Sequence, residues 1–485
     1  MDRSTLIFPQ AVDSLQADRG IIRGQLRDTY NRLHSIAADA EFISDEVSTA
    51  YPDFPVIPNQ RAGAWYVKPT EETPRAYFKS TDGHTNEHDF NLRRVNLILL
   101  PVIKERKGIV LVDSTRRGKR FPDALSKTVP LWCATLNAAR MKLVSPDPSN
   151  SSVSKEDWEK EGILYTSPQA VGPSEHAQIA KQIDKWAKDL ANSAYDLEGL
   201  KTLDRPLRPF FVSPSSSLSR HVASDFSGCY PIICASASKL AEEADGMERA
   251  RGFTYVQGSG DDHEAWSKGL TPKVFWDHAD EILSASREEI DSIIARILDE
   301  TLLSSNLAST SLSNPSSTAS STRIRKTRIS LAFAVDPPTD QSPISLSVSV
   351  AATKTLPPPL SSEEPANPFD LMAKPGKAGY NTFFNNLEQT IELASAGIKE
   401  DQEVVILVRP SDTQSEANDL GVAVALILLV RLYDNDGALL PSLPTSISKD
   451  LVRSRLQWIL EAFPSINPSR AVLNRVNEYL IRRTK

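Results

Sequence analysis

GIVLVDSTRRGKR, which spans Gly108–Arg120, is the segment from which the rest of the sequence can be interpreted. Its four apolar residues, Ile109 to Val112, predict a short buried strand that ends at Asp113. The loop after Asp113 combines basic, hydroxyl and glycine residues: Ser114, Thr115, Arg116, Arg117, Gly118, Lys119 and Arg120. Such a loop offers the donors that surround a phosphate or pyrophosphate group. The alternative is an ordinary basic turn at the edge of a sheet.

Length and charge limit the classes of protein that remain open. A chain of 485 residues is long enough for two or three domains with ample core. Its formal net charge of −7 does not suggest a nucleic-acid partner, so any basic surface must be local. The window from Lys104 to Arg120 is such a place, because seven of its residues are Lys or Arg and only Glu105 and Asp113 are acidic.

Cysteine content and hydropathy indicate the compartment. The three cysteines, Cys133, Cys229 and Cys234, form neither a disulfide framework nor a zinc knuckle, and their apolar surroundings predict core positions. The first ten residues lack the pattern of a secretory signal. The longest apolar run, Gly421–Val430, has about half the length of a membrane span. We expect a cytoplasmic protein without membrane contact, with the nucleus as the alternative location.

Alternating strands, polar loops and helices predict an N-terminal α/β domain over residues 1–303. The predicted strands are Asn96–Ile103, Ile109–Val112, Phe210–Val212, Tyr230–Ala235 and Phe253–Val256. The predicted helices are Asp18–Ser48, Asp123–Ala139, a helix capped by Ser174 and one after Lys239. A Pro-rich loop is predicted around Pro52, Pro55 and Pro58.

A segment rich in Ser and Thr, residues 304–324, predicts a flexible linker because it has too little apolar surface to bury. After it, a second α/β domain is predicted over residues 325–485. Its expected strands are Ile329–Phe333, Ile344–Val350 and Glu403–Val408. Its expected helices are Phe383–Ala396, Gly421–Leu432 and two terminal ones, the last starting at Asn467-Pro468 and burying Val472, Val476, Tyr479 and Leu480. Leu356–Pro368 is expected to be a proline-rich loop.

Five segments resemble one family, the initiator-tRNA 2′-O-ribosyl phosphate transferases of fungi and plants. These segments are Tyr77–Thr85 (YFKSTDGHT), Phe90–Leu97 (FNLRRVNL), Val112–Cys133, Tyr255–Glu264 (YVQGSGDDHE) and Asn467–Arg470 (NPSR). The resemblance implies transfer of a 5-phosphoribosyl group from phosphoribosyl pyrophosphate to the 2′-hydroxyl of the adenosine at position 64 of initiator tRNA. It also implies Mg²⁺ as a companion of the donor, and a C-terminal domain with a dual-specificity-phosphatase fold.

The C-terminal domain departs from a phosphatase pattern. The predicted strand Glu403–Val408 leads into a long, acidic loop that begins at Arg409 and contains no cysteine, and no cysteine follows Cys234 anywhere in the sequence. Thiolate phosphatase chemistry is therefore excluded there, because the nucleophile is missing. We expect this domain to dock the tRNA or to act as a scaffold. A catalytically degenerate tRNA-binding or regulatory protein is the alternative function.

Transfer from an anomeric carbon requires that the leaving group be neutralised and that the acceptor hydroxyl lose its proton. The loop Ser114–Arg120 suits the first task, and contact with tRNA phosphates is its alternative role. Asp113 is predicted either to bind the ribose or Mg²⁺, or to hold the arginines in place. The general base is predicted to be Asp82, His84, Asp113 or none of these, and Lys79 and Ser80 are predicted phosphate ligands. The Asp82-Gly83 pair also predicts a plain turn.

Three further patterns have two interpretations each. His84-Thr-Asn-Glu87-His88 matches a zinc-hydrolase signature, which needs a helix, although its residues are poor helix formers. Asp261 and Asp262 are candidate Mg²⁺ ligands, or Asp261 caps a helix with Glu264. Ser236, Ser238 and Lys239 predict a second phosphate cradle or a capped turn.

Overall fold

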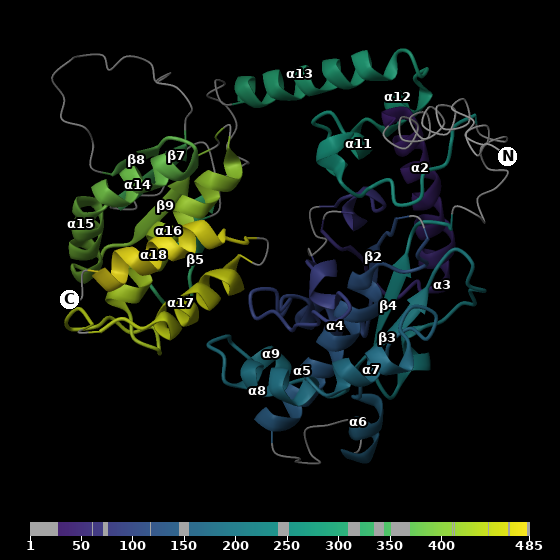
Figure 1. Ribbon diagram of the computed structural model, residues 1–485, viewed down its shortest axis with the longest axis horizontal. Coiled ribbons are helices and arrows are strands. Elements are labelled where there is room, and N and C mark those ends of the chain that lie inside the picture. Colours follow the sequence, from purple (N-terminus) through teal and green to yellow (C-terminus); the bar gives the residue numbers. More distant parts are fainter. Residues whose placement is uncertain are drawn as a thin grey trace, which may run out of the picture. The chain divides into compact units, whose positions relative to one another are not determined.

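The structure is a computed structural model that describes residues 28–60, 62–70, 76–116, 118–144, 155–240, 252–308, 321–333, 344–350, 369–409, 411, 413–444, 446–463 and 466–482. The chain divides into two compact units (Figure 1). Unit 1 extends up to Leu307, except for Leu92–Arg94 and Ser193–Asp196, which belong with the rest of the chain to unit 2. Both units combine parallel strands with helices, which confirms the predicted α/β class.

Unit 1 is built on a four-stranded, wholly parallel sheet of order β1-β2-β4-β3. Its strands are β1 (Val56–Pro58), β2 (Ile109–Asp113), β3 (Leu207–Val212) and β4 (Tyr230–Ser236). The register pairs Asp113 with Ser236 and Val212 with Ala235. The carboxyl ends of the strands therefore meet at one edge of the sheet, where α/β proteins place their ligands.

Unit 1 also contains helices and short helical turns, which begin before β1 and continue after each strand. They are α2 (Thr29–Glu41), η2 (Phe42–Val47), α3 (Ser48–Ala50), η3 (Gly63–Trp65), η4 (Ser80–Gly83), α4 (Leu99–Arg106), η5 (Ala124–Thr128), α5 (Val129–Leu143), α6 (Lys155–Glu161), α7 (Pro173–Ala180), α8 (Ile183–Ala191), α9 (Glu198–Lys201), η7 (Ala223–Phe226), η8 (His263–Ala265), α11 (Pro272–Asp277), α12 (Ala279–Ser284) and α13 (Ile290–Ala308).

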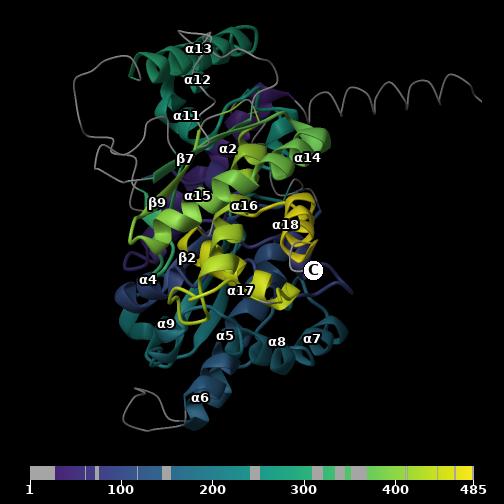
Figure 2. The ribbon, with the colours of Figure 1, turned by 90° about the vertical axis from the view of Figure 1, so that its left-hand side faces the viewer.

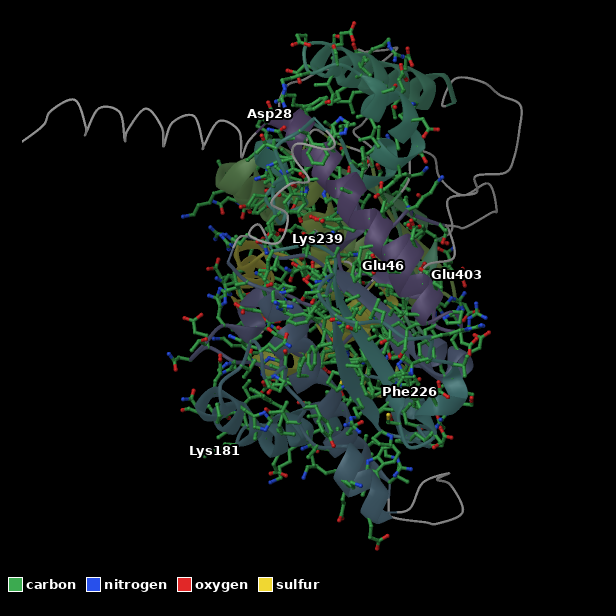
Figure 3. All side chains as sticks on the ribbon, turned by 90° about the vertical axis from the view of Figure 1, so that its right-hand side faces the viewer. Asp28, Glu46, Lys181, Phe226, Lys239 and Glu403 are labelled. Atoms are coloured by element: carbon green, nitrogen blue, oxygen red, sulfur yellow. The ribbon has the colours of Figure 1, made fainter. Side chains whose placement is uncertain are left out.

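Alternate residues of the central strands face two different layers. Val110, Val112 and Ile233 pack in one cluster with Leu33 and Ile36 of α2, and Figure 3 shows α2 and the turns after it running from Asp28 toward Glu46 across this side of the unit. On the other side, α5 packs against β3 and α8. Both central strands are buried along their whole length, because β2 and β4 are covered on both faces.

Unit 2 contains a five-stranded sheet of order β5-β6-β9-β7-β8, in which only the β5–β6 pairing is antiparallel. Its elements are β5 (Thr322–Arg323), β6 (Ile329–Phe333), β7 (Ile344–Val350), β8 (Asp370–Ala373), α14 (Gly376–Asn386), α15 (Glu388–Lys399), β9 (Val404–Val408), α16 (Gln414–Leu432), α17 (Lys449–Ala462) and α18 (Arg470–Arg482). Helix α16 lies among the other helices and the sheet (Figures 1 and 2), so its residues from Leu420 to Val430 are all buried.

Two predicted strands of unit 1 are wrong. The segment Asn96–Ile103 is mostly helix α4, which follows a turn at Asn96 with φ of 52° and a hydrogen bond from Leu99 N to Asn96 O. The segment Phe253–Val256 joins no sheet. Its backbone donors are bound by side chains of α2 instead: Thr254 N donates to Asn31 Oδ1 at 3.0 Å and Val256 N to Ser35 Oγ at 2.9 Å.

Several predicted boundaries also differ from the structure. The Pro-rich loop contains strand β1, which ends at Pro58. Helix α7 is preceded by Gly172 rather than capped by Ser174, and α18 starts at Arg470, with Val472 N bonded to Ser469 Oγ at 3.3 Å. The predicted helix Phe383–Ala396 is two helices that meet at Leu387. Residues 304–308, which were expected in the linker, form the last residues of α13.

Some predictions fall outside the described residues: the start of the first helix before Asp28, the helix expected after Lys239 from residue 241 on, and the Leu356–Pro368 loop. The inward positions Val472, Val476, Tyr479 and Leu480 are confirmed as buried, as are all three cysteines. No helix in the described part of the chain is long and apolar enough to cross a membrane.

Candidate active site

A cavity of about 210 Å³ opens at the carboxyl end of β2 in unit 1. Segments far apart in the sequence form its wall: the loop after β1, the region of η4, the loop after β2 and the segment before η8. The lining residues are Asn59, Gln60, Ala62, Phe78, Lys79, Ser80, Thr81, His84, Asp113, Ser114, Thr115, Arg116, Lys119, Pro122, Asp123, Asp261 and Asp262. The cavity thus gathers residues that the sequence singled out in three separate segments.

Asp113 is the buried acid of this cavity, with 4% of its surface exposed. Its Oδ2 accepts a hydrogen bond from Asn59 Nδ2 at 2.7 Å, and its Oδ1 accepts one from Ser114 N at 2.9 Å. Burial raises the pKa of Asp113 to about 7, although these hydrogen bonds favour the charged form. Asn59 is itself fixed, because its side chain exchanges two hydrogen bonds with the backbone of Phe78. The carboxyl group therefore has a fixed orientation.

Cations line the same cavity. The side chains of Arg116 and Lys79 have no hydrogen bond or ion pair with any described residue. Lys119 differs, because its Nζ lies 3.0 and 3.1 Å from the two carboxylate oxygens of Asp123. The buried residues Ser114 and Thr115 add hydroxyl groups to the wall. The arrangement can bind a polyanion, because Arg116 and Lys79 are positive groups that no carboxylate in the described part of the chain neutralises.

The loop after β2 rests on the segment Gly258–Asp262. Gly258 has φ of +73°, and a Cβ atom at this position would lie 2.7 Å from Thr115 O and 2.8 Å from Arg116 N. Glycine is therefore required both by the backbone conformation and by the close approach. The segment is held from behind by Ser238 Oγ, which accepts from Gly258 N at 3.2 Å, and by Tyr66 Oη, which accepts from Gly260 N at 2.9 Å.

Asp261 and Asp262 reach the cavity from this segment. Asp262 has left-handed backbone geometry, with φ of 48°, and it precedes η8 without a side-chain capping bond. The predicted cap at Asp261 with Glu264 is therefore wrong. In the described part of the chain, no three His, Cys, Asp or Glu side chains gather closely enough to hold a metal ion by themselves.

Asp123 joins the cavity to a buried ionic network. Its Oδ2 lies 3.1 Å from His84 Nδ1, and Lys127 Nζ lies 3.5 Å from its Oδ1. Lys127 continues to Glu175 of α7 at 2.9 Å. Burial opposes the charge of Asp123, but Lys119, Lys127 and His84 outweigh burial and hold its pKa below the usual value. His84 is consequently oriented by a carboxylate.

The turn that carries His84 and His88 is not helical. Asn86 has φ of 67°, and Glu87 N donates to His84 O. His88 Nε2 is bonded to Glu175 Oε1 at 3.0 Å, whereas His84 contacts Asp123. The two imidazoles are therefore held by different carboxylates, and the zinc-hydrolase interpretation of His84-x-x-Glu87-His88 is wrong because it needs both on one helical face.

Six predicted site residues do not line the cavity. Asp82 is a buried residue of η4, and Arg120 and Gly118 belong to the loop beside the cavity. Ser236 is buried beside Asp113 in the sheet register, Ser238 holds the Gly258 segment, and the carbonyl of Lys239 accepts from Tyr255 Oη. Figure 3 labels Lys239 beside α2. Arg117 lies outside the described residues.

Sequence reasoning missed Asn59 and Asp123. Asn59 follows a strand of only three residues within a proline-rich stretch, so no periodic pattern marks it. Asp123 lies in the segment Val112–Cys133, which carries the family resemblance, but its position before a helix is equally typical of a capping residue. The sequence therefore contained evidence for a role of Asp123, but a helix-capping role explained the residue equally well.

Unit 2 has a separate cavity of about 540 Å³ beside the starts of α14, α16 and α18. Two acidic residues of α16 accept hydrogen bonds from backbone N–H groups at the starts of neighbouring helices. Glu416 accepts from Gly376 N at 3.0 Å, and Asp419 accepts from Ser469 N at 3.1 Å. Strand β9 ends at Val408, and the chain reaches α16 without a cysteine. In the same unit, Arg93 donates to Pro468 O, so two segments that carry the resemblance meet there.

Fold and site together define a class: a two-unit α/β protein with a cationic cavity, containing acids, at the carboxyl edge of a parallel sheet. Residues 22–299 match the Rit1 N-terminal domain and residues 367–480 match the Rit1 DUSP-like domain. The chain therefore belongs to the Rit1 family, and the predicted phosphatase-like C-terminal domain without a catalytic cysteine is confirmed.

Two curated relatives match along most of their length. The chain is 33% identical to the tRNA A64-2′-O-ribosylphosphate transferase of Saccharomyces cerevisiae, over 95% of this chain and 93% of that protein. It is 34% identical to an uncharacterized protein of Schizosaccharomyces pombe, over 95% of this chain and 96% of that protein. No solved structure matches the chain.

Proposed function

We propose that this protein transfers a 5-phosphoribosyl group from phosphoribosyl pyrophosphate to the 2′-hydroxyl of the adenosine at position 64 of initiator tRNA. The observation that carries the proposal is the 33% identity to the yeast transferase over 95% of the chain. The cavity of unit 1 supports it independently, because its cations and acids match a donor that carries phosphate groups and ribose hydroxyls. The modified tRNA would be marked against use in elongation.

In this proposal, the loop after β2 binds the phosphate groups of the donor. Arg116 and Lys79 are available for charge-assisted hydrogen bonds, since neither is paired with a described residue. The backbone and hydroxyls of Ser114 and Thr115 add neutral donors. Each hydrogen bond to a charged group contributes about 1.5–3 kcal/mol, so a few of them suffice to stabilise the departing pyrophosphate.

Mg²⁺ fits the acids of the same cavity. This ion is commonly bound by one or two carboxylates together with substrate phosphates. Asp261 and Asp262 are the proposed ligands, and Asp113, which lines the same cavity, is proposed to contact the ribose hydroxyls. When bound, the ion would neutralise part of the negative charge that develops on the leaving group.

The second unit is proposed to contribute to docking the tRNA. No cysteine follows Cys234, so hydrolysis of phosphate esters by a thiolate is excluded in this unit. Its Rit1 DUSP-like domain would then serve as a binding module with a phosphatase-like fold. The proposed compartment is the cytoplasm.

The test is incubation of the purified protein with phosphoribosyl pyrophosphate labelled in its 5-phosphate and with initiator tRNA. Label is expected on the tRNA, and a tRNA with 2′-deoxyadenosine at position 64 should remain unlabelled because the accepting hydroxyl is missing. Absence of label on the unmodified tRNA would favour the alternative of a tRNA-binding protein without catalysis, provided that the protein retards the tRNA in a gel.

Arg116→Ala tests the site within this reaction. Loss of one charge-assisted contact of about 1.5–3 kcal/mol should lower kcat/KM for the donor roughly 10- to 100-fold. Arg220→Ala is the matched control, because Arg220 is an exposed arginine of unit 1 that does not line the cavity. Equal activity of the two variants would contradict the assignment of the cavity as the donor site.

A further inference from the structure

The cavity contains a histidine whose two ring nitrogens have different surroundings. His84 Nδ1 lies 3.1 Å from Asp123 Oδ2, while Nε2 has no partner among the described residues. The side chain of His84 is 48% exposed, and it lines the cavity. A carboxylate on one nitrogen fixes the tautomer, so that the proton resides on Nδ1 and the lone pair of Nε2 is free.

Asp123 is held more firmly than a surface acid. Its side chain is 9% exposed, and Lys119 and Lys127 both approach its carboxylate oxygens. Lys127 is in turn fixed by Glu175 at 2.9 Å and by Thr85 Oγ1 at 3.2 Å. Glu175 also accepts from Thr85 Oγ1 at 2.8 Å, so the residue next to His84 is tied to the same network.

The other two candidate bases are less well placed. Both carboxylate oxygens of Asp113 accept hydrogen bonds, from Asn59 Nδ2 and Ser114 N. Asp82 is buried in η4 and does not line the cavity. Only His84 among the three combines an open position on the cavity with a nitrogen that is free to accept a proton.

We propose that Asp123 is the positioning residue of His84, which takes the proton of the 2′-hydroxyl. In this step the hydroxyl oxygen forms a bond to the anomeric carbon of the donor, and the bond from that carbon to pyrophosphate breaks. The proton passes to His84 Nε2, and pyrophosphate leaves with the bonding electron pair. Asp123 stabilises the imidazolium through Nδ1, and the half-exposed ring then releases its proton to solvent. The proposal rests on the function proposed above.

As the positioning residue of the general base, Asp123 must act through His84. It also contacts Lys119, so an effect through that lysine has to be separated from an effect through the imidazole. The charged and titratable groups around the imidazole and its carboxylate are Lys79, Lys119, Lys127, His88 and Glu175. A double-mutant cycle separates the two routes, because residues that act as a unit are strongly non-additive.

The experiment measures kcat and KM for the donor in Asp123→Asn, His84→Gln and the double variant. Asp123→Asn should lower kcat about 100-fold or more, the usual range for a general base, with little change in KM for the donor. In the His84→Gln background the same substitution should cost less than about threefold, and Asp123→Glu should recover part of the activity.

Two results would overturn the proposal. The first is a loss of activity from Asp123→Asn that is equal with and without His84 and is accompanied by a raised KM for the donor. That result would show that Asp123 acts through Lys119 instead of His84. The second is an unchanged kcat of Asp123→Asn. Folding of each variant is checked by its thermal midpoint; Asp123 makes no side-chain cap to η5, so the helix start does not depend on it.

A second measurement does not depend on turnover. The ¹⁵N chemical shifts of His84 should show the proton on Nδ1 in the unaltered protein and a mixture of tautomers in Asp123→Asn. If the unaltered protein transfers no label to tRNA, the proposed function fails. The NMR result then decides separately whether Asp123 sets the tautomer of His84, and equal tautomer populations in both proteins would refute that.

Discussion

Asp39 carries a fully buried carboxyl group on α2. Its Oδ1 accepts a hydrogen bond from Tyr255 Oη at 2.8 Å, which connects α2 to the segment that leads into Gly258–Asp262. Burial raises the pKa of Asp39 to about 7, and the hydrogen bond from Tyr255 offsets only part of this effect. A group of this kind makes folding stability depend on pH.

The sign of that dependence follows from the direction of the shift. The folded state binds the Asp39 proton more tightly than the unfolded chain, whose carboxyl has its ordinary pKa near 3.8. The contribution to the free energy of unfolding is therefore complete below about pH 4 and is lost as the pH rises toward 7. A difference of about three pKa units corresponds to a few kcal/mol.

Asp39→Asn should flatten this dependence, because an amide does not titrate. Urea unfolding at pH 5 and pH 8 measures the effect as a smaller loss of stability in the variant than in the unaltered protein. Asp113, whose pKa is also raised to about 7, should account for much of the dependence that remains. An identical pH dependence in the two proteins would show that Asp39 stays charged in the folded state.

Residue types in the sequence predicted the chemistry of the cavity, but not which residues act together. Lys79, His84, Asp113 and Arg116 were predicted from their local patterns, and all four line the cavity. The partners Asn59 and Asp123 were missed, because a hydrogen bond between residues 54 or 39 positions apart leaves no local signal. Local sequence patterns predict backbone conformation, whereas the tertiary fold decides which distant side chains pair.

At the scale of elements, α5 is fixed to the sheet by a polar contact. Asn137 of α5 is 1% exposed, and its side chain exchanges hydrogen bonds with the backbone of Leu207, the first residue of β3. Its Nδ2 also lies 3.3 Å from Gly162 O. One amide side chain thus satisfies buried backbone groups of two other segments.

Asn137→Ala should destabilise the protein by about 2–4 kcal/mol, since it leaves a buried donor and acceptor of Leu207 without partners. Urea unfolding measures the loss. Gln178→Ala on the exposed face of α7 is the control and should change stability by less than about 0.5 kcal/mol. A loss of under 1 kcal/mol for Asn137→Ala would mean that water replaces the amide.

The elements that could be predicted are those with a strong local pattern. Strand β4 and the strand residues of β2 read as continuous apolar runs, and α16 as an apolar helix, because each is buried on all sides. Strand β1 has three residues and α4 begins in an apolar stretch, so neither has a distinctive period. Phe253–Val256 looks like a strand but is bound by side chains of α2.

At the scale of the whole molecule, no thiol is available for chemistry. Cys133, Cys229 and Cys234 are the only cysteines of the sequence, and all are buried in unit 1. Burial raises the pKa of Cys133 and Cys234 well above the ordinary value. Both features oppose formation of a reactive thiolate.

Iodoacetamide should therefore label none of the cysteines in the native protein and all three in urea, as mass spectrometry would measure. Treatment of the native protein should leave transfer to tRNA unchanged within about twofold. Rapid labelling of a cysteine without urea would contradict the burial of that residue, and loss of transfer with it would place a thiol near the active site.

By itself, the sequence determined the α/β class, the division into two domains of different character, the absence of a phosphatase nucleophile and the family. These properties depend on local apolar runs, on residue types and on long specific segments, all of which can be read without coordinates. Only the tertiary structure decided that Lys79, His84, Asp113 and Asp261 share one cavity and that Asp123 holds His84. The physical reason is that parallel strands bring their carboxyl ends together wherever they lie in the sequence, and the side-chain pairs formed there are set by packing.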